Sequence, residues 1–264
     1  MRIQRVFARR LGAAIVRMVV TACLSGPAIA ACRDLVFENT AYTVCDFDPK
    51  TEEIRVYHSD PDGKPFSGFD ALVRQLWEER HYLVFATNGG MYHDDLSPVG
   101  LLVEYGIERR PISTKAGWGN FHLLPNGVFS MKNGRAAITE SRRYARRHVA
   151  ADYATQSGPM LVIEGTLHPK FLPDSDSFKI RNGVGVDGDG KVHFVISNTP
   201  VRFYDFARLF RDTLGCPNAL YLDGTISSAY IPERGRRDRL FPLGPIIAVI
   251  GTVPQLSADS GRTP

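Results

Sequence analysis

Hydrophobic residues recur with a helical period in two segments of the chain, and the two segments have nearly the same spacing. In the first segment the apolar positions fall at i, i+3, i+4, i+7 and i+8, and they are Phe69, Leu72, Val73, Leu76 and Trp77. In the second segment the apolar positions are Phe203, Phe206, Leu209, Phe210 and Leu214. The pattern predicts two amphipathic helices, the first with Ser67 as its N-cap and the second ended by Gly215.

An apolar strand that ends in small polar residues follows each predicted helix. The first strand covers residues 82–87 and leads into Asn88 and Gly89. The second covers residues 218–222 and leads into a longer polar cluster, which consists of Asp223, Gly224, Thr225, Ser227 and Ser228. Binding and catalytic groups concentrate at such strand ends, so both clusters are candidate site residues. The alternative interpretation of the second cluster is a simple Asp-Gly turn with solvated serines.

Several shorter segments have the composition of β-strands. They comprise an exposed strand at 53–58, hairpins at 35–44, 121–131 and 182–197, and core strands at 160–163 and 246–250. No segment in the middle of the sequence has the composition of a linker. The sequence therefore predicts one α+β domain, in which a mixed, twisted β-sheet carries the polar strand ends on one rim and helices pack on it.

The N-terminal residues have the composition of a secretory signal peptide. Four arginines precede an apolar run that ends in Ala28-Ile29-Ala30, a small-x-small cleavage pattern. We expect residues 1–31 to be removed by the general secretory route, which leaves a domain at 32–254 and a disordered polar tail at 255–264. The protein is then periplasmic or secreted.

Export changes the charge balance of the chain. The whole sequence has 32 Lys and Arg against 28 Asp and Glu, but residues 1–31 hold five arginines and no acidic residue, which leaves 27 basic against 28 acidic residues. A net-charge argument for nucleic-acid binding therefore fails. Local basic clusters remain at 142–148 and 234–239, each interpreted as a solvated face or as a peripheral contact with phosphate-rich glycans or lipid head groups of the envelope.

Three cysteines lie beyond the predicted signal peptide, where an oxidising compartment favours disulfides. Cys32 and Cys45 flank the predicted 35–44 hairpin, and a disulfide between them would contribute roughly 3 kcal/mol by closing the loop. Cys216 is then a buried free thiol. Residues 29–32 also resemble a lipoprotein cleavage box, and lipidation of Cys32 would exclude the disulfide. We favour the disulfide, because Cys45 otherwise lacks a partner.

Two acidic clusters are weaker candidates for metal binding. His93, Asp94 and Asp95 adjoin in the loop after the first strand, but the other histidines lack the spacing of a zinc site, so a polar loop is favoured. The Asp-Gly pairs at 187–190 lack the closing acid of a calcium loop and predict a turn. We therefore expect no metal and no other cofactor.

Two further motifs place polar groups beside small residues. Ser157, Gly158 and Pro159 enter the predicted 160–163 strand, without the Gly-x-Ser-x-Gly pattern of a serine hydrolase. Arg181 precedes a strand of small residues that offers little bulk to hide it. Its planar guanidinium group is therefore expected to reach a carboxylate or phosphate in a cleft.

Four motifs, taken in order, resemble the phosphodiester glycosidase family. They are Asn88-Gly89-Gly90-Met91-Tyr92, Gln156-Ser157-Gly158-Pro159, Arg181-Asn182-Gly183-Val184-Gly185-Val186 and Leu222-Asp223-Gly224-Thr225-Ile226-Ser227-Ser228. The similarity runs from about Tyr82 to Val253. The last motif has Thr225 and Ile226 where the family usually has glycines, a departure that resembles a bacterial branch of the family.

The resemblance implies an exported hydrolase that cleaves a sugar-1-phosphodiester at the anomeric carbon, in an envelope glycan. It implies Asp223 and Arg181 as catalytic residues, with Asp94 or Asp95 as the nearest candidates for an acidic partner. The substrate-binding residues it implies are Asn88, Gly89, Ser157, Gly158, Thr225, Ser227 and Ser228. Two alternatives stay open: a non-catalytic periplasmic glycan-binding protein, and a metal-dependent phosphodiesterase built on the His93 cluster.

Overall fold

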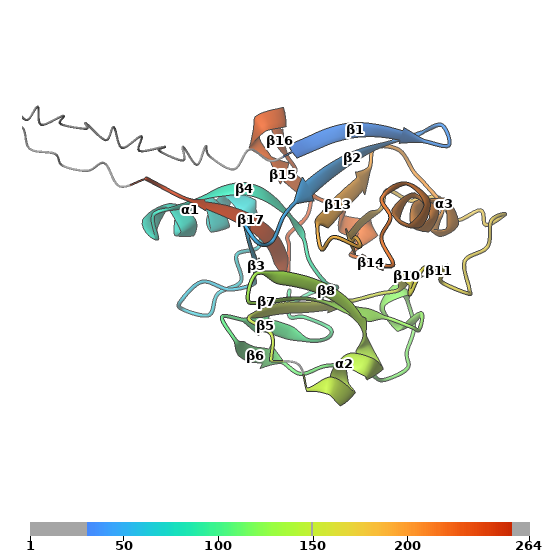
Figure 1. The fold of residues 1–264 in the computed structure, drawn as a ribbon. Helices are drawn as coiled ribbons and strands as arrows, with labels where there is room; N and C mark the ends of the chain where they lie inside the picture. The colour runs from blue at the N-terminus through green and yellow to red at the C-terminus, as the bar shows by residue number, and fades with distance from the viewer. Residues whose placement is uncertain (1–30, 149, 255–264) are drawn as a thin grey trace, which may run out of the picture.

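The described part of the chain, residues 31–148 and 150–254 of a computed structural model, folds into three sheets and three α-helices (Figure 1). The α+β class is confirmed. The strand pairing differs from the single mixed sheet that we expected, because short turns connect many neighbouring strands and each pair of named strands is antiparallel. The predicted tail and all but the last residue of the predicted signal peptide lie outside the described residues. No helix in those described ranges is long and apolar enough to cross a membrane.

The largest sheet has seven strands and adjoins three of the four motifs. In spatial order they are β1 (Ala31–Phe37), β2 (Thr40–Phe47), β13 (Val192–Ser197), β12 (Asn182–Val186), β14 (Asn218–Tyr221), β10 (Met160–Ile163) and β11 (Thr166–Leu167). The register of β1 against β2 sets Cys32 opposite Cys45, and the predicted disulfide joins them. Cys216 is free and buried, also as predicted.

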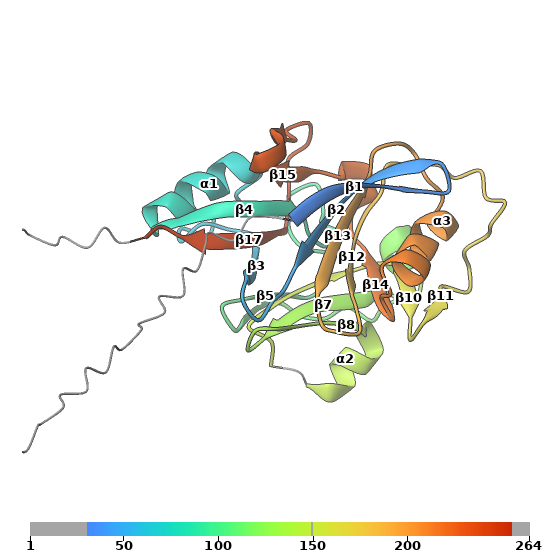
Figure 2. The same cartoon turned by 45° about the horizontal axis from the view of Figure 1, so that its top comes forward.

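A five-stranded sheet carries the Asn88 motif. Its strands, in spatial order, are β16 (Arg236–Arg237), β15 (Ala229–Ile231), β4 (His81–Asn88), β17 (Ile246–Thr252) and β3 (Glu53–Tyr57). Helix α1 (Phe69–Glu78) packs on this sheet and lies along β4 in Figure 2. Leu72 and Leu76 of the helix are buried in one apolar cluster with Ala248 of β17.

Three details of this region differ from the prediction. Helix α1 begins after Gly68, because Ser67 adopts a left-handed backbone conformation with φ 58° and makes no cap. Trp77 is 67% exposed, since it lies about 80° around the helix from Phe69, at the edge of the apolar face. The strand expected to be exposed at 53–58 is β3, in which Ile54, Val56 and Tyr57 are buried because they face apolar clusters on its two sides.

The second five-stranded sheet consists of β6 (Ile107–Arg110), β5 (Leu102–Glu104), β9 (Tyr153–Ser157), β7 (Gly127–Lys132) and β8 (Arg135–Glu140), and α2 (Ser141–Arg147) follows it. The hairpin predicted at 121–131 is wrong. Residues Asn120–His122 form a 3₁₀ turn, and β7 pairs with β8 and β9 instead. The buried side chain of Asn126 donates a hydrogen bond to Phe121 O at 2.9 Å, so the Pro-Asn-Gly segment turns inward.

Helix α3 (Phe203–Arg208) and the π-helical turn that continues it (Leu209–Thr213) pack on the seven-stranded sheet. Phe206 and Phe210 are fully buried there. Gly215 has a φ of 63°, so it ends this helical segment as predicted.

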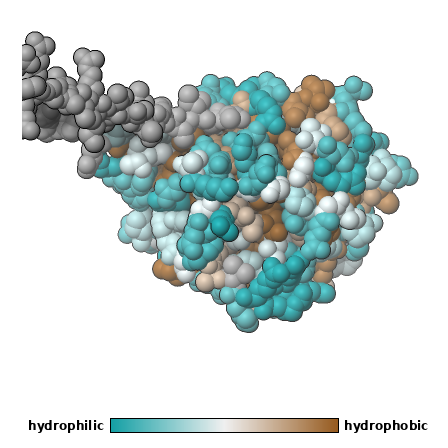
Figure 3. Space-filling view, in the orientation of Figure 1, coloured by the Kyte–Doolittle hydropathy of each residue, from teal (hydrophilic) through white to brown (hydrophobic). Residues whose placement is uncertain are grey.

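The two basic clusters have different surroundings. The arginines of α2 are exposed, and a strongly hydrophilic patch lies over this helix at the lower edge of Figure 3. In the other cluster, Arg234 pairs with Asp34, while Arg237 and Arg239 both pair with Asp70. The second cluster therefore adds little net positive charge to the surface.

Candidate active site

The four motifs meet beside the loop that begins at Asp223. Three backbone hydrogen bonds join them, from Asn88 N to Ser228 O at 3.3 Å, from Leu222 N to Asn182 O at 3.1 Å, and from Tyr221 N to Pro159 O at 3.1 Å. The polar strand ends are therefore neighbours in space, as a common site requires.

The side chain of Asn88 holds both ends of the Asp223 loop. It is fully buried, and its Nδ2 donates to the backbone oxygen of Asp223 at 3.1 Å. Its Oδ1 accepts hydrogen bonds from Ser228 N at 2.9 Å and from Asn182 Nδ2 at 2.8 Å. Asn182 Nδ2 also donates to Thr87 Oγ1 at 3.0 Å. Asn88, which we predicted to bind substrate, thus directs its polar atoms to the protein and fixes the loop.

The Asp223 loop is a tight 3₁₀ turn that only glycine permits at its start. The turn covers Gly224–Ile226, and a Cβ atom on Gly224 would overlap the hydroxyl of Tyr221. Ser227 Oγ donates to Gly224 O at 3.1 Å, and Ser228 Oγ donates to Ile226 O at 2.7 Å. The two serine hydroxyls therefore close the turn, which leaves Asp223, half-buried at its entrance, as the charged group of the loop.

Two tyrosines lie within electrostatic range of the Asp223 carboxylate. Burial raises the pKa of Tyr92, and the negative charge of Asp223 raises it further. Burial likewise raises the pKa of Tyr221 to about 12, with Asp223 contributing in the same direction while Arg181 opposes it. Both phenols are neutral at physiological pH, and the Tyr92 hydroxyl donates its hydrogen bond to Pro242 O at 2.5 Å. We did not predict either residue: Tyr221 is hidden in an apolar run, although Tyr92 ends the first motif.

Arg181 is a buried cation beneath this loop. It is 1% exposed, and it donates from Nε to Val201 O at 2.8 Å and from Nη2 to Ser177 O at 3.0 Å. Its guanidinium carbon lies 3.5 Å from the centre of the Phe203 ring and 5.6 Å from that of Tyr221. Burial lowers its pKa, whereas the neighbouring Tyr221 side chain opposes that shift.

The accessible position that we expected for Arg181 is therefore not observed. Aromatic rings from distant segments cover the side chain, although its own strand is made of small residues. Its positive charge is held next to Tyr221, which in turn touches the start of the Asp223 loop.

The Ser157 motif packs closely against the Asn88 motif and against Asn126. Ser157 is fully buried, and its Oγ has no hydrogen-bond partner among the described residues. A Cβ atom on Gly158 would lie 2.6 Å from Asn126 Cβ, and one on Gly90 would overlap Gln156 O. The glycines thus permit close approach of the first and second motifs. Gly89, also a predicted binding residue, donates its N–H to a backbone oxygen at 2.6 Å.

The His93 cluster is an exposed loop. The Asp95 carboxylate accepts hydrogen bonds from Ser97 Oγ at 2.6 Å and Ser97 N at 2.9 Å, and these bonds lower its pKa. Within residues 31–148 and 150–254 there is no group of three His, Cys, Asp or Glu side chains arranged to hold a metal ion. The Asp95 carboxylate therefore serves to stabilise its own turn.

The solved structures that share this fold include the following two. One is the catalytic domain of zebrafish N-acetylglucosamine-1-phosphodiester alpha-N-acetylglucosaminidase, auto-inhibited by its pro-peptide, with a TM-score of 0.58, 12% identity, and coverage of 83% of this chain and 81% of that one. The other is a hypothetical protein from Synechocystis, with a TM-score of 0.55, 14% identity, and coverage of 83% and 61%.

Sequence comparison identifies the family more specifically than the shared fold does. The uncharacterized protein YigE of Escherichia coli K12 is 33% identical over 209 residues, which cover 79% of this chain and 80% of YigE. The sequence profile of the phosphodiester glycosidases matches residues 81–242, a range that includes all four motifs. The chain belongs to the phosphodiester glycosidase family.

Proposed function

We propose that this protein is an exported glycosidase that hydrolyses a sugar-1-phosphodiester at the anomeric carbon, with the Asp223 carboxylate placed against the sugar. The observation that carries the proposal is the fixation of the Asp223 loop at both ends by Asn88. Asn88 is buried and its side chain is fully hydrogen-bonded, so it fixes the main chain that carries the half-buried Asp223 carboxylate. Catalysis requires such support, because the reacting group must be positioned before the substrate binds.

The chemistry of the substrate fits this set of residues. Cleavage at an anomeric carbon passes through an oxocarbenium-like transition state, which a carboxylate stabilises, attacks, or relieves by activating water. A phosphodiester is already a weakly basic leaving group, so it gains little from a general acid. The positive charge of Arg181, held beside the neutral Tyr221 phenol at the start of the Asp223 loop, suits the departing phosphate because it stabilises the developing negative charge.

Export and an envelope substrate are part of the same proposal. The disulfide between Cys32 and Cys45 is typical of proteins in an oxidising compartment. The disulfide uses the Cys32 sulfur, which would have to be free for a lipid anchor at this residue. We propose a periplasmic or secreted enzyme, whose substrate is a glycosyl phosphodiester of the cell envelope.

The decisive experiment follows oxygen from isotopically labelled water into the products. Protein purified after export is incubated with sugar-1-phosphodiesters, and mass spectrometry locates the label. A glycosidase places the label in the free sugar and releases an unlabelled phosphomonoester. A phosphodiesterase places it in the phosphate, which would contradict the proposal.

Variants test the role of the carboxylate in the same assay. We expect Asp223→Asn to lower turnover by about 100-fold or more. The matched control is Asp189→Asn, in an exposed turn, which should leave turnover unchanged. Saturable glycan binding without turnover, unaltered in Asp223→Asn, would instead identify a glycan-binding protein.

A further inference from the structure

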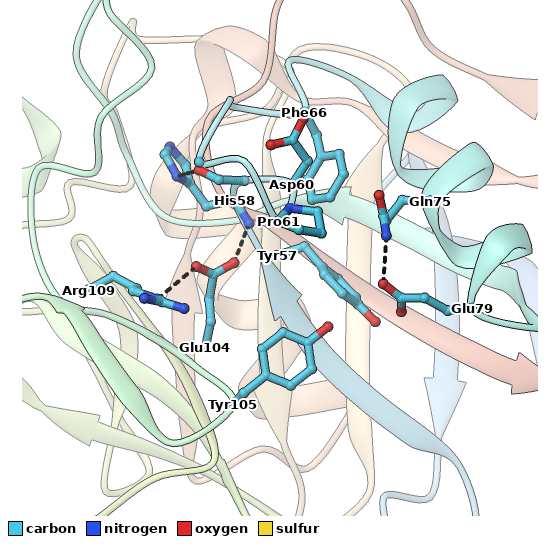
Figure 4. Close-up of a pocket in the computed structure, with 12 residues that line it drawn as sticks. Tyr57, His58, Asp60, Pro61, Phe66, Gln75, Glu79, Glu104, Tyr105 and Arg109 are labelled. Atoms are coloured by element: carbon cyan, nitrogen blue, oxygen red, sulfur yellow. Dashed lines mark hydrogen bonds and ion pairs between the residues drawn. The ribbon is translucent and has the colours of Figure 1, made fainter.

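A cavity apart from the Asp223 loop opens between α1, the loop after β3, and the hairpin of β5 and β6 (Figure 4). Its volume is about 380 Å³, which is within the range of small-molecule sites. Carboxylates and aromatic rings line it together, among them Tyr57, Asp60, Phe66, Glu79, Glu104 and Tyr105. None of the residues that fix the Asp223 loop lines this cavity, so the family chemistry does not account for it.

Glu104 is the buried carboxylate of the cavity. It is 6% exposed, and its Oε1 accepts a hydrogen bond from His58 N at 2.7 Å. Its Oε2 lies 3.7 Å from Arg109 Nε, which is longer than a hydrogen bond. Burial raises the pKa of Glu104, although the backbone N–H groups of His58 and Ser59 and the charges of His58 and Arg109 oppose that shift. A carboxylate held out of water with a loosely placed partner is stabilised by a cation that enters the cavity.

The charge of the lining favours the same kind of ligand. Asp60, Glu79 and Glu104 contribute three carboxylates, whereas Arg109, which is 52% exposed, and the His58 imidazole contribute at most two positive charges. The cavity is therefore net negative, and its field repels phosphates and other anions while it attracts cations.

Tyrosines add a second recognition element. The rings of Tyr57 and Tyr105 meet edge to face, with centroids 6.3 Å apart, and Figure 4 shows both beside Glu104. Tyr105 is 52% exposed, so its ring is accessible to a ligand, and the negative charge of Glu79 acts on its hydroxyl. Aromatic faces attract cations, and phenol oxygens accept hydrogen bonds from them. Arg55 already makes both contacts from outside the cavity lining: its Nη1 donates to the Tyr57 hydroxyl at 3.3 Å, and its guanidinium carbon lies 5.8 Å from the centre of the Tyr105 ring.

We propose that this cavity binds the protonated primary amine of a small molecule. Three N–H donors of an ammonium group match the acceptors that the cavity offers, namely carboxylate oxygens and phenol oxygens. A quaternary ammonium group would satisfy the aromatic rings but leave Glu104 without a hydrogen-bond donor. A neutral hydroxyl compound would leave the negative charge uncompensated.

The test titrates three probes into the full exported protein and follows binding by nuclear magnetic resonance. Ethanolamine carries the primary amine, choline the quaternary amine, and ethylene glycol neither charge. We expect saturable binding of ethanolamine, binding of choline that is weaker, and no saturation with ethylene glycol. Equal binding of ethylene glycol, tighter binding of choline, or no binding of ethanolamine would each overturn the proposal.

Variants locate the site. Glu104→Gln keeps the acceptor for His58 N but removes the charge, and it should weaken ethanolamine binding by about tenfold or more. Glu79→Gln, on the exposed end of α1, should weaken binding without affecting the fold. The matched control is Glu108→Gln, exposed on the same hairpin but outside the cavity, which should bind as the native protein does. Undiminished binding in both Glu104→Gln and Glu79→Gln would overturn the proposal.

Discussion

Asn88 and Asp223 are 135 positions apart in the sequence, and a hydrogen bond of 3.1 Å joins the side-chain Nδ2 of the first to the backbone oxygen of the second. This bond does not touch the Asp223 carboxylate. It fixes the main chain from which the carboxylate extends, so the orientation of that carboxylate depends on a buried amide of another sheet.

Removing that amide should affect both stability and turnover. Asn88→Ala leaves Ser228 N and Asn182 Nδ2 without their acceptor, and we expect the free energy of unfolding to fall by about 2 kcal/mol. Urea unfolding and turnover are measured for Asn88→Ala, Asn182→Ala and the double variant. Because the two side chains bond each other, their effects should be non-additive. Additive effects would contradict a single supporting network.

Gly224 should not tolerate even one methyl group. Gly224→Ala places a Cβ atom on the Tyr221 hydroxyl, which must move together with the turn that carries Asp223. We expect a loss of about 1–3 kcal/mol in unfolding free energy and a loss of most turnover. Gly188→Ala is a suitable control, because no atom lies within 4 Å of a Cβ at that position. If Gly224→Ala has the turnover of the native protein, the turn does not determine the position of the Asp223 carboxylate.

Arg181 should contribute charge as well as packing. Arg181→Met keeps a long apolar side chain over Phe203 but removes the cation, and we expect kcat to fall by about 100-fold with a smaller change in KM. The control is Arg208→Met, which removes an arginine of α3 that pairs with Glu38. If turnover falls only as much as the fraction of folded protein falls, Arg181 has a purely structural role.

The disulfide should stabilise the edge of the seven-stranded sheet. It closes a loop with a sequence separation of 13, and its removal in Cys32→Ser/Cys45→Ser should lower the free energy of unfolding by about 3 kcal/mol. Reducing agent should have the same effect on the native protein and none on this variant. Cys216→Ser, which changes the buried free thiol, should leave the response to reducing agent intact.

The Glu104 carboxylate should make stability depend on pH. Its pKa in the folded state is raised above the ordinary value of 4.5, mainly by burial, so the folded protein binds this proton more tightly than the unfolded chain does. The stabilisation is complete below pH 4.5 and is lost as the pH rises through the folded pKa. Urea unfolding across this range should show a smaller decline with pH for Glu104→Gln than for the native protein. An identical decline in both would contradict the assigned shift.

The sequence by itself determined the local elements and the candidate site residues. The spacing of Leu72 and Leu76 predicted α1, because periodicity records which side of a helix is buried. The Asp-Gly pairs at 187–190 predicted the turn of the hairpin that joins 182–186 to 192–197. The four motifs identified the family, and the spacing of Cys32 and Cys45 predicted the disulfide.

The Pro-Asn-Gly segment shows where local signals fail. Its composition is typical of an exposed hairpin tip, yet Asn126 is buried and bonded to Phe121 O. A buried polar side chain needs a partner, and the availability of that partner depends on neighbouring segments rather than on the turn itself.

Only the tertiary structure decided which contacts each motif residue makes. Arg181 is covered by the ring of Phe203, Asn88 is bonded to Asp223 and Ser228, and the Asp223 loop depends on a glycine that fits against Tyr221. Each of these relations joins segments that are distant in sequence or depends on how closely neighbouring groups pack. Local composition predicts which groups are available for chemistry, whereas long-range packing and hydrogen bonding determine which of them face the substrate and which hold the others in place.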